Sequence, residues 1–210
     1  MQLDVLLAFS TATAALAISP GPDNIYVLMQ SVVHGKRFGL ATVAGLMTGC
    51  LVHTTLLAFG VSALLRRHEG FFFVITLFGA TYLLYLAVNV YRENRGIDMA
   101  GDALPKKTLV QLFKQGFVMN VLNPKVTIFF LAFFPGFLFS DTLGTVAQFY
   151  ILGFLFIAVS SVVFGGIALL SGGVSRWLSG NSKAAFFLKW MQIVVFVGIA
   201  LYLLSSNNLW

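Results

Sequence analysis

The chain has 210 residues, of which 59% are hydrophobic and 10% are charged, with a mean hydropathy of +0.91 and a formal net charge of +6. A soluble domain of this length has no interior large enough to bury so much apolar surface, so the composition indicates a protein whose solvent is the lipid bilayer. Cys50 is the single cysteine, which excludes an internal disulfide, a CxxC redox pair and a thiolate metal cage.

The first apolar stretch, roughly Leu3–Gln30, is predicted to cross the membrane and to break at Ser19-Pro20-Gly21-Pro22-Asp23-Asn24. It lacks a positively charged start and runs past the length of a cleavable signal peptide. The prolines remove amide donors and clash with preceding carbonyls, while the glycine permits unusual dihedral angles. Charges inside membranes are rare and usually mark a substrate or ion pathway, so Asp23 is a candidate site residue. The alternative is that Asp23 only caps the half-helix that begins after the second proline.

The second and third spans are predicted at roughly Phe38–Leu65 and Phe71–Tyr91, followed by the hydrophilic stretch Arg92–Lys107. Each span has about 20 residues or more, enough to cross a hydrocarbon core of about 30 Å as a helix. His53 in the second span is interpreted either as a packed, hydrogen-bonded histidine or as a gating or proton-relay residue.

The fourth span, roughly Phe113–Phe139, is interrupted in the same manner as the first. Pro124 opens the backbone there, and Lys125 places a base inside the span. Asn120 and Asn123 are predicted either to satisfy the freed backbone groups or to contact substrate. Lys125 is a candidate substrate-binding residue, and a purely structural role as counter-ion of the acid is the alternative.

The fifth and sixth spans, roughly Leu143–Ser171 and Ala184–Leu204, complete a count of six. Gln192 in the last span is a candidate gating or relay residue, although packing explains it as well. Tyr82 is interpreted as packing against another aromatic ring rather than stacking on substrate. Small residues let membrane helices approach closely, and this role is expected for four glycines, Gly45, Gly49, Gly165 and Gly166.

These elements predict an all-α membrane protein of six transmembrane helices in two inverted three-helix repeats, with the first and fourth helices broken at proline motifs. Spans of matching length recur in the same order, and Pro22 has its counterpart in Pro124. A unit with three crossings must enter the membrane upside down when it is duplicated. Residues 1–91 would form the first repeat, residues 92–112 a cytoplasmic linker and residues 113–210 the second repeat, within one integral membrane domain.

The distribution of Lys and Arg predicts the orientation. On one side the loops hold only Arg66 and Arg67, whereas the first, third and fifth loops hold the other basic residues that flank the spans. Cytoplasmic loops carry an excess of Lys and Arg, so we expect a cytoplasmic linker and both termini outside. The same asymmetry accounts for the net charge without a nucleic-acid partner.

Asp23 and Lys125 are predicted to meet near the middle of the bilayer. Each lies about three to four helical turns from a lysine assigned to the cytoplasmic face, which places both roughly 16–20 Å inward at about 1.5 Å per residue. We expect a direct or water-bridged pair, because an unpaired charge in mid-membrane is costly. Half-helix N-termini favour anions and freed carbonyls favour an ammonium, and an α-amino acid zwitterion offers both groups.

Several motifs resemble the LysE/RhtB family of amino-acid exporters, of the homoserine/threonine/leucine efflux type. The resemblance covers nearly the whole chain, and the motifs follow the family's order and spacing. It implies a bacterial inner-membrane exporter of small amino acids or derivatives, driven by the proton gradient. Gly136-Phe137 departs from the family, in which a polar residue often precedes the phenylalanine. The matching motifs are Ser19–Asn24, Gly35-Lys36-Arg37, Ala44-Gly45-Leu46-Met47-Thr48-Gly49, Gly79–Leu86, and Asn120–Lys125 leading into Phe133-Phe134-Pro135.

The predicted function is therefore secondary transport by proton antiport, not enzymatic catalysis, with the coupling proton on Asp23. The expected partners are an amino acid, protons and the bilayer, with a homo-oligomer left open and no cofactor, metal or nucleic acid. The alternative is a metal or inorganic-ion exporter of related architecture, which the scarcity of His, Cys and acidic residues inside the spans disfavours. An intramembrane enzyme is disfavoured because the sequence lacks an HExxH motif and a cysteine pair.

Overall fold

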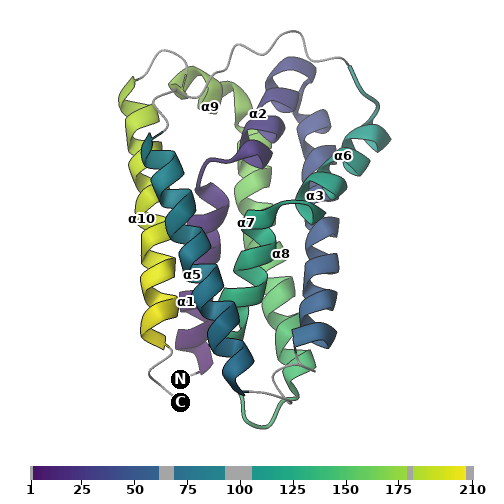
Figure 1. The fold of residues 1–210 in the computed structure, drawn as a ribbon. Helices are drawn as coiled ribbons and strands as arrows, with labels where there is room; N and C mark the ends of the chain where they lie inside the picture. Colours follow the sequence, from purple (N-terminus) through teal and green to yellow (C-terminus); the bar gives the residue numbers. More distant parts are fainter. Residues whose placement is uncertain (1, 62–68, 93–105, 179–181, 207–210) are drawn as a thin grey trace.

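The computed structural model describes residues 2–61, 69–92, 106–178 and 182–206, and within these ranges all regular structure is helical. Long helices run side by side along one direction, and two of the paths bend near mid-height (Figure 1). The helical elements in chain order are α1 (Gln2–Ile18), α2 (Pro22–His34), α3 (Lys36–Leu56), η1 (Leu57–Val61), α5 (Glu69–Arg92), α6 (Leu109–Val121), α7 (Pro124–Ile128), η2 (Phe129–Phe133), η3 (Phe134–Phe137), α8 (Thr145–Leu169), α9 (Ser171–Leu178) and α10 (Ser182–Ser206).

Four helical segments are each long and apolar enough to cross a bilayer: Lys36–Gly60, Phe73–Arg92, Thr145–Leu169 and Phe186–Ser205. Two further pairs qualify when each bent pair is one span. The pair α1 and α2 bends by 62°, and α6 bends by 49° against the helical segment that starts at Pro124. The described residues therefore offer four spans, or up to six, in a multi-pass membrane protein. Helix breaks at the first and fourth positions agree with the sequence prediction, and the inverted repeat stays a prediction.

Most helix boundaries lie within a few residues of the predicted spans, and local chemistry explains where they fall. Gly35 separates α2 from α3 with a φ of 99°, a left-handed conformation that favours glycine and permits the tight turn. Helix α6 begins at Leu109, four residues before the predicted start. Thr108 and Gln111 form a capping box there, with each side chain bonded to the other's backbone amide. The predicted linker, residues 92–112, is therefore partly helical at its end.

Helix α9 has no counterpart among the predicted spans. It covers only Ser171–Leu178 and lies across one end of the bundle, between the ends of α8 and α10 (Figure 1). Eight residues cannot cross a hydrocarbon core, so the hydropathy of the chain gives little signal for this helix. Trp177 and Arg176 are both exposed on it, which suits a position at the membrane–water interface.

Glycines set the closest approach of α3 to its neighbours. A Cβ atom at Gly45 would overlap the backbone of α6, and one at Gly49 would overlap the side chain of Asn120. These two glycines act as predicted, because only small residues permit such contact between membrane helices. The same prediction is wrong for Gly165 and Gly166, where an added Cβ would meet nothing within 4 Å.

A cluster of phenylalanine rings packs the half of the bundle between η2, η3 and α1. Phe129 and Phe133 stack with ring centroids 4.4 Å apart, and Phe9 meets Phe134 edge-on at 4.9 Å. All four rings are buried. Aromatic pairs at these separations are stabilised beyond their area of burial. The bent segment that starts at Pro124 is therefore anchored below its break by tight packing.

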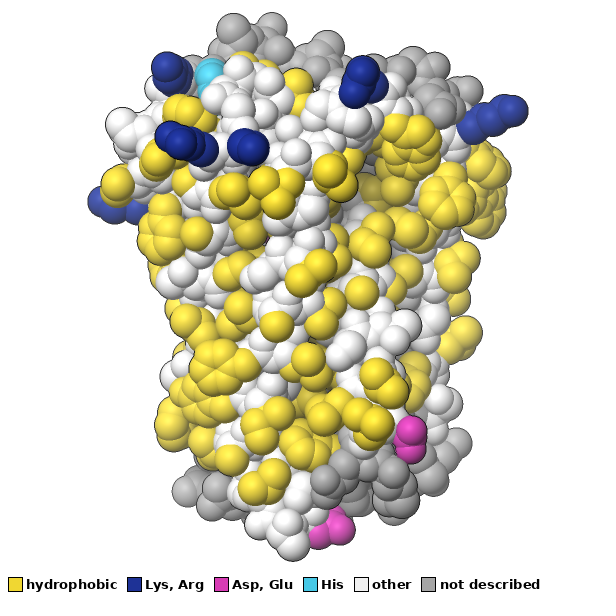
Figure 2. Space-filling view, turned by 180° about the vertical axis from the view of Figure 1, so that it is seen from behind, with side chains coloured by type: hydrophobic (Ala, Val, Ile, Leu, Met, Phe, Trp, Pro, Cys, Tyr) yellow, Lys and Arg dark blue, Asp and Glu magenta, His cyan; other side chains and the backbone are white. Residues whose placement is uncertain are grey.

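Charged side chains separate between the two ends of the molecule. Figure 2 shows lysine and arginine side chains gathered at one end and acidic side chains at the other, with an apolar surface between them. The basic end is the one at which α5 ends and α6 begins, and α1 begins at the opposite end (Figure 1). This is the charge pattern on which the predicted orientation depends.

Candidate substrate-binding site

The first helix break contains an extended Gly21 that serves as the N-cap of α2, with Pro22 at the first helical position. Pro is tolerated there because the first amides of a helix have no intrahelical partner. Asp23 stands in the first turn and does not cap the helix, so the capping interpretation is wrong. Across the break, Asn24 Nδ2 donates a hydrogen bond of 2.7 Å to the carbonyl of Ala17 at the end of α1. Asp23 is therefore buried without a capping role.

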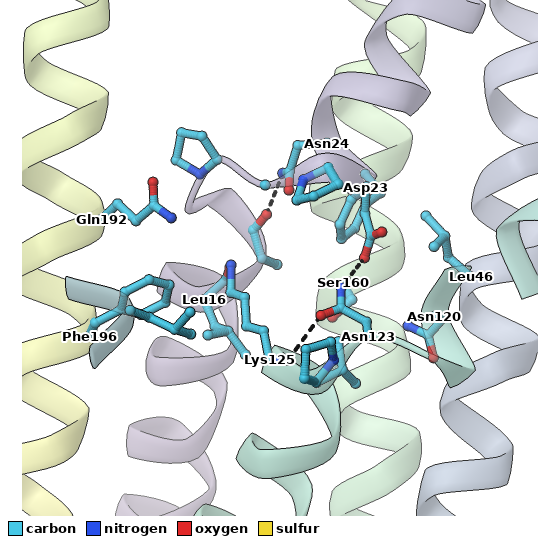
Figure 3. Close-up of a pocket in the computed structure, with 18 of the residues that line it drawn as sticks. Leu16, Asp23, Asn24, Leu46, Asn120, Asn123, Lys125, Ser160, Gln192 and Phe196 are labelled. Carbon is cyan, nitrogen blue, oxygen red and sulfur yellow. Dashed lines mark hydrogen bonds between the residues drawn. The ribbon is translucent and has the colours of Figure 1, made fainter. Parts of the chain in front are cut away.

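The second break is organised by an asparagine. Asn123 is the N-cap of α7, and its Oδ1 accepts the backbone N–H of Lys125 at 3.0 Å. Pro124 occupies the first position of α7, the same arrangement as in α2. An asparagine N-cap followed by proline is a favoured way to start a helix. Both half-helices thus direct their N-terminal first turns toward the middle of the bundle (Figure 3).

The two breaks are joined to each other by side-chain hydrogen bonds. Asn123 Nδ2 donates to Asp23 Oδ2 at 2.7 Å, the contact drawn in Figure 3. Lys125 Nζ donates to the carbonyl of Leu16 at 3.2 Å and to that of Ser19 at 3.3 Å. These carbonyls lie at the C-terminal end of α1 and just beyond it, where the helix dipole attracts a cation. The acid thus belongs to one break and the base to the other, and each contacts the opposite segment.

A direct or a water-bridged pair is expected for Asp23 and Lys125, and the direct pair is not found. Within the described residues no ion pair joins them, since the ammonium binds the α1 carbonyls and the carboxylate binds Asn123. Lys125 Nζ also lies 5.2 Å from the centroid of the Phe196 ring, a cation–π distance. The physical reason is that the freed carbonyls at the break need hydrogen-bond donors, and the Lys125 ammonium donates to them instead of to the Asp23 carboxylate.

A cavity of about 340 Å³ lies at the breaks and is lined by residues from nearly every long helix. This volume is near the lower limit of small-molecule sites, which suits a small ligand. Nine residues of the two predicted break motifs line it, together with Gln192 from α10. They are Pro20, Gly21, Pro22, Asp23, Asn24, Asn120, Asn123, Pro124 and Lys125.

His53 lies outside the residues that line the cavity. Its Nε2 is 3.1 Å from the carbonyl oxygen of Asn120, and its ring packs against Phe130 at 5.5 Å. Asn120 Nδ2 in turn donates to Cys50 Sγ at 3.4 Å. His53 is thus a packed, hydrogen-bonded histidine that holds the end of α6 against α3. The Gln148 side chain bonds the backbone of the loop before α8.

Sequence reasoning missed several residues of the cavity wall. Tyr82, interpreted as a packing residue, faces the cavity and also packs against Tyr85 with ring centroids 6.0 Å apart. A polar residue inside an apolar span was the available signal for Asn89 and Ser160. No comparable signal exists for the apolar wall, which is made by Leu16, Ala17, Leu46, Met47, Cys50, Leu86, Val90, Val126, Phe156, Phe164 and Phe196.

Apolar spans, two broken helices and a charged cavity between them define the class of a multi-pass membrane transporter. The family profile described as LysE type translocator matches residues 14–207, and the chain belongs to this family, as its motifs suggested.

Relatives are similar along almost their whole length. The homoserine/homoserine lactone efflux protein of Salmonella typhimurium is 32% identical, over 87% of this chain and 88% of that protein. The leucine efflux protein of Enterobacter sp. (strain 638) is 28% identical, over 91% of each chain. An uncharacterized membrane protein of Vibrio cholerae is 25% identical, over 85% of this chain and 86% of that protein. No solved structure matches the chain.

Proposed function

We propose that this protein is a secondary transporter that exports small amino acids or their derivatives from the cytoplasm across a bacterial inner membrane. The observation that carries the proposal is the cavity in which Asp23 and Lys125 are held on opposite helix breaks. A cavity with one anionic and one cationic group is complementary to a zwitterion. Relatives named for homoserine efflux and leucine efflux support the same cargo class.

The carboxylate of the substrate is assigned to the Lys125 side of the cavity. An ammonium has three donors, and Lys125 gives two of them to the carbonyls of Leu16 and Ser19. The third remains for an anion. A Cβ built on Gly21 would lie 4.0 Å from Lys125 Nζ, so glycine leaves room beside the ammonium. The Gln192 amide, on the same side of the cavity in Figure 3, adds a neutral donor.

The ammonium of the substrate is assigned to Asp23. Asn123 occupies Oδ2, and no described residue donates a hydrogen bond to Oδ1. The carbonyls at the end of α1 already accept hydrogen bonds from Lys125 and Asn24. They are therefore poor acceptors for the ammonium of the substrate. A carboxylate oxygen in a largely apolar cavity attracts a cation more strongly than it would in water.

Asp23 is also assigned the coupling proton. Protonation from the outer side would neutralise the carboxylate, weaken the ammonium site and release the substrate outward. Return of the protonated carrier would then deliver the proton to the cytoplasm. A ligand can drive such a cycle only through different affinities of the two states, and the charge of Asp23 provides that difference. His53 is assigned to holding the break at Asn120 rather than to proton relay.

We assign the basic end of the bundle to the cytoplasm, with two inverted three-helix repeats joined there by the linker. The excess of Lys and Arg at one end supports this orientation, and the described residues offer up to six spans when each bent pair is counted as one. Reporter fusions within Arg92–Lys107 are expected to give a cytoplasmic signal, and fusions after Ser206 an outside signal. A cytoplasmic reporter at the C-terminus would contradict the six-span topology.

Profiling of the culture medium tests the proposed cargo. Bacterial cells that overproduce the protein are expected to accumulate one or a few small neutral amino acids outside, relative to cells with the Asp23→Asn variant. The cytoplasmic pools of the same amino acids should fall. If overproduction instead changes only the metal content or metal tolerance of the cells, the cargo is a metal ion and not an amino acid.

A further inference from the structure

The hydroxyl of Ser160 has no hydrogen-bond partner among the described residues. Ser160 lies in the middle of α8 and is 1% exposed, and its Oγ is one of the buried polar atoms left unpaired there. Serine inside a helix commonly bonds the carbonyl four residues earlier, as Ser31 does with Val27 at 2.7 Å. A buried hydroxyl without a partner lowers the stability of the fold, so its position calls for a hydrogen-bond partner.

Ser160 belongs to the cavity wall. Ser160 lines the cavity between Phe156 and Phe164, which stand one helical turn before and after it on the same face. Leu46 and Met47 of α3 pack in one cluster with Phe164. The four apolar side chains Leu46, Met47, Phe156 and Phe164 thus form a largely apolar part of the wall, whose polar groups are the Ser160 hydroxyl and the Asn120 amide. In Figure 3, Leu46 lies beyond Asp23 on the side away from Gln192 and Phe196.

We propose that Ser160 is a specificity-determining residue that hydrogen-bonds a hydroxyl on the substrate side chain. The preferred cargo is then a neutral amino acid whose short side chain carries a hydroxyl group. This inference rests on the proposed function, because it takes the Lys125 side for the carboxylate and Asp23 for the ammonium. The side chain must then occupy the remaining compartment, which Leu46, Met47 and Ser160 line.

The character of the compartment decides which substrate group meets Ser160. A substrate ammonium against two phenylalanines, a leucine and a methionine would lose its hydration without a counter-ion, which is far more costly than burying a hydroxyl. A cationic side chain is disfavoured for the same reason. An aliphatic side chain fits the apolar wall but leaves Oγ of Ser160 unpaired. A hydroxyl satisfies both the wall and the serine.

Paired probes of equal size test the inference. L-homoserine and L-norvaline differ only by a hydroxyl in place of a methyl group. Purified protein in liposomes is expected to transport homoserine roughly two- to twelvefold better than norvaline, the range that one net hydrogen bond of about 0.5–1.5 kcal/mol gives. Ser160→Ala should remove this preference by lowering homoserine transport, with norvaline transport unchanged or raised.

Ser161→Ala is the matched control, since this neighbouring serine does not line the cavity. It should keep the wild-type preference. A second readout uses wild-type protein alone, where homoserine should raise the melting temperature more than norvaline does. Equal losses of both substrates in Ser160→Ala, or a wild type without preference, would overturn the assignment of Ser160. A wild type that transports neither probe nor any other amino acid contradicts the proposed function itself.

Discussion

Replacing Asp23 by asparagine should lower proton-driven export to the level of cells that lack the protein, while the protein folds and inserts normally. Asparagine has nearly the shape of aspartate, and its Oδ1 can accept the bond that Asn123 Nδ2 gives to Asp23 in the wild type. The break therefore keeps its geometry. The variant loses the charge that would attract the substrate ammonium and the group that would carry the proton. Efflux from preloaded cells under a fixed proton gradient measures the effect.

The matched control for this variant is Asp141→Asn. Asp141 is exposed in the loop between η3 and α8, and this loop lies at the end of the bundle opposite the one at which α5 ends (Figure 1). Its substitution should leave export at the wild-type rate. Wild-type export by the Asp23→Asn variant would show that the carboxylate serves only the structure of the break. Exchange of substrate across the membrane without a gradient is the one activity that the variant can retain.

Lys125→Met should impair both folding and transport. The variant leaves the carbonyls of Leu16 and Ser19 without their donor, and each buried unpaired group costs about 1–3 kcal/mol. It also leaves the buried charge of Asp23 without a cation in the same cavity. We expect a clearly lower melting temperature in detergent and loss of substrate-induced thermal stabilisation. Thermal unfolding with and without amino acid measures the two effects separately.

Lys114→Met is the control for this second prediction, because Lys114 is exposed on α6 and lies outside the cavity. That variant should keep the wild-type melting temperature and response to substrate. If Lys125→Met binds amino acids as the wild type does, the ammonium has no role toward the carboxylate. A loss of stability with unchanged binding would restrict Lys125 to bridging the breaks.

The broken helices could be predicted from the sequence because proline, glycine and intramembrane charge are strong local signals. Pro22 and Pro124 remove amides wherever they stand in a helix, so both breaks follow from covalent chemistry. The convergence of Asp23, Asn123 and Lys125 on one cavity followed from their similar depth. Their hydrogen-bond partners could not be predicted. Whether Lys125 donates to the Asp23 carboxylate or to the α1 carbonyls depends on atomic positions in the packed bundle.

Packing also explains which cavity-lining residues could not be predicted from the sequence. Leu46 and Phe164 are apolar residues in apolar spans, and nothing in their pattern separates a cavity wall from a lipid-facing surface. Gly165 and Gly166 carry the pattern of close-packed glycines, yet space is open around their Cα atoms. In a soluble protein, hydrophobic periodicity would mark the inner face of each helix. A bilayer removes that contrast because both faces of a span are apolar.

Amino-acid flux through the purified protein under an imposed pH gradient tests the central claim most directly. The protein is reconstituted in liposomes loaded with a labelled neutral amino acid. Efflux of the amino acid is measured with the same pH on both sides and again with an acidic exterior. We expect the acidic exterior to accelerate amino-acid efflux, protons to enter as the amino acid leaves, and Asp23→Asn to abolish the acceleration. Efflux that is indifferent to the pH gradient in the wild type would contradict the claim.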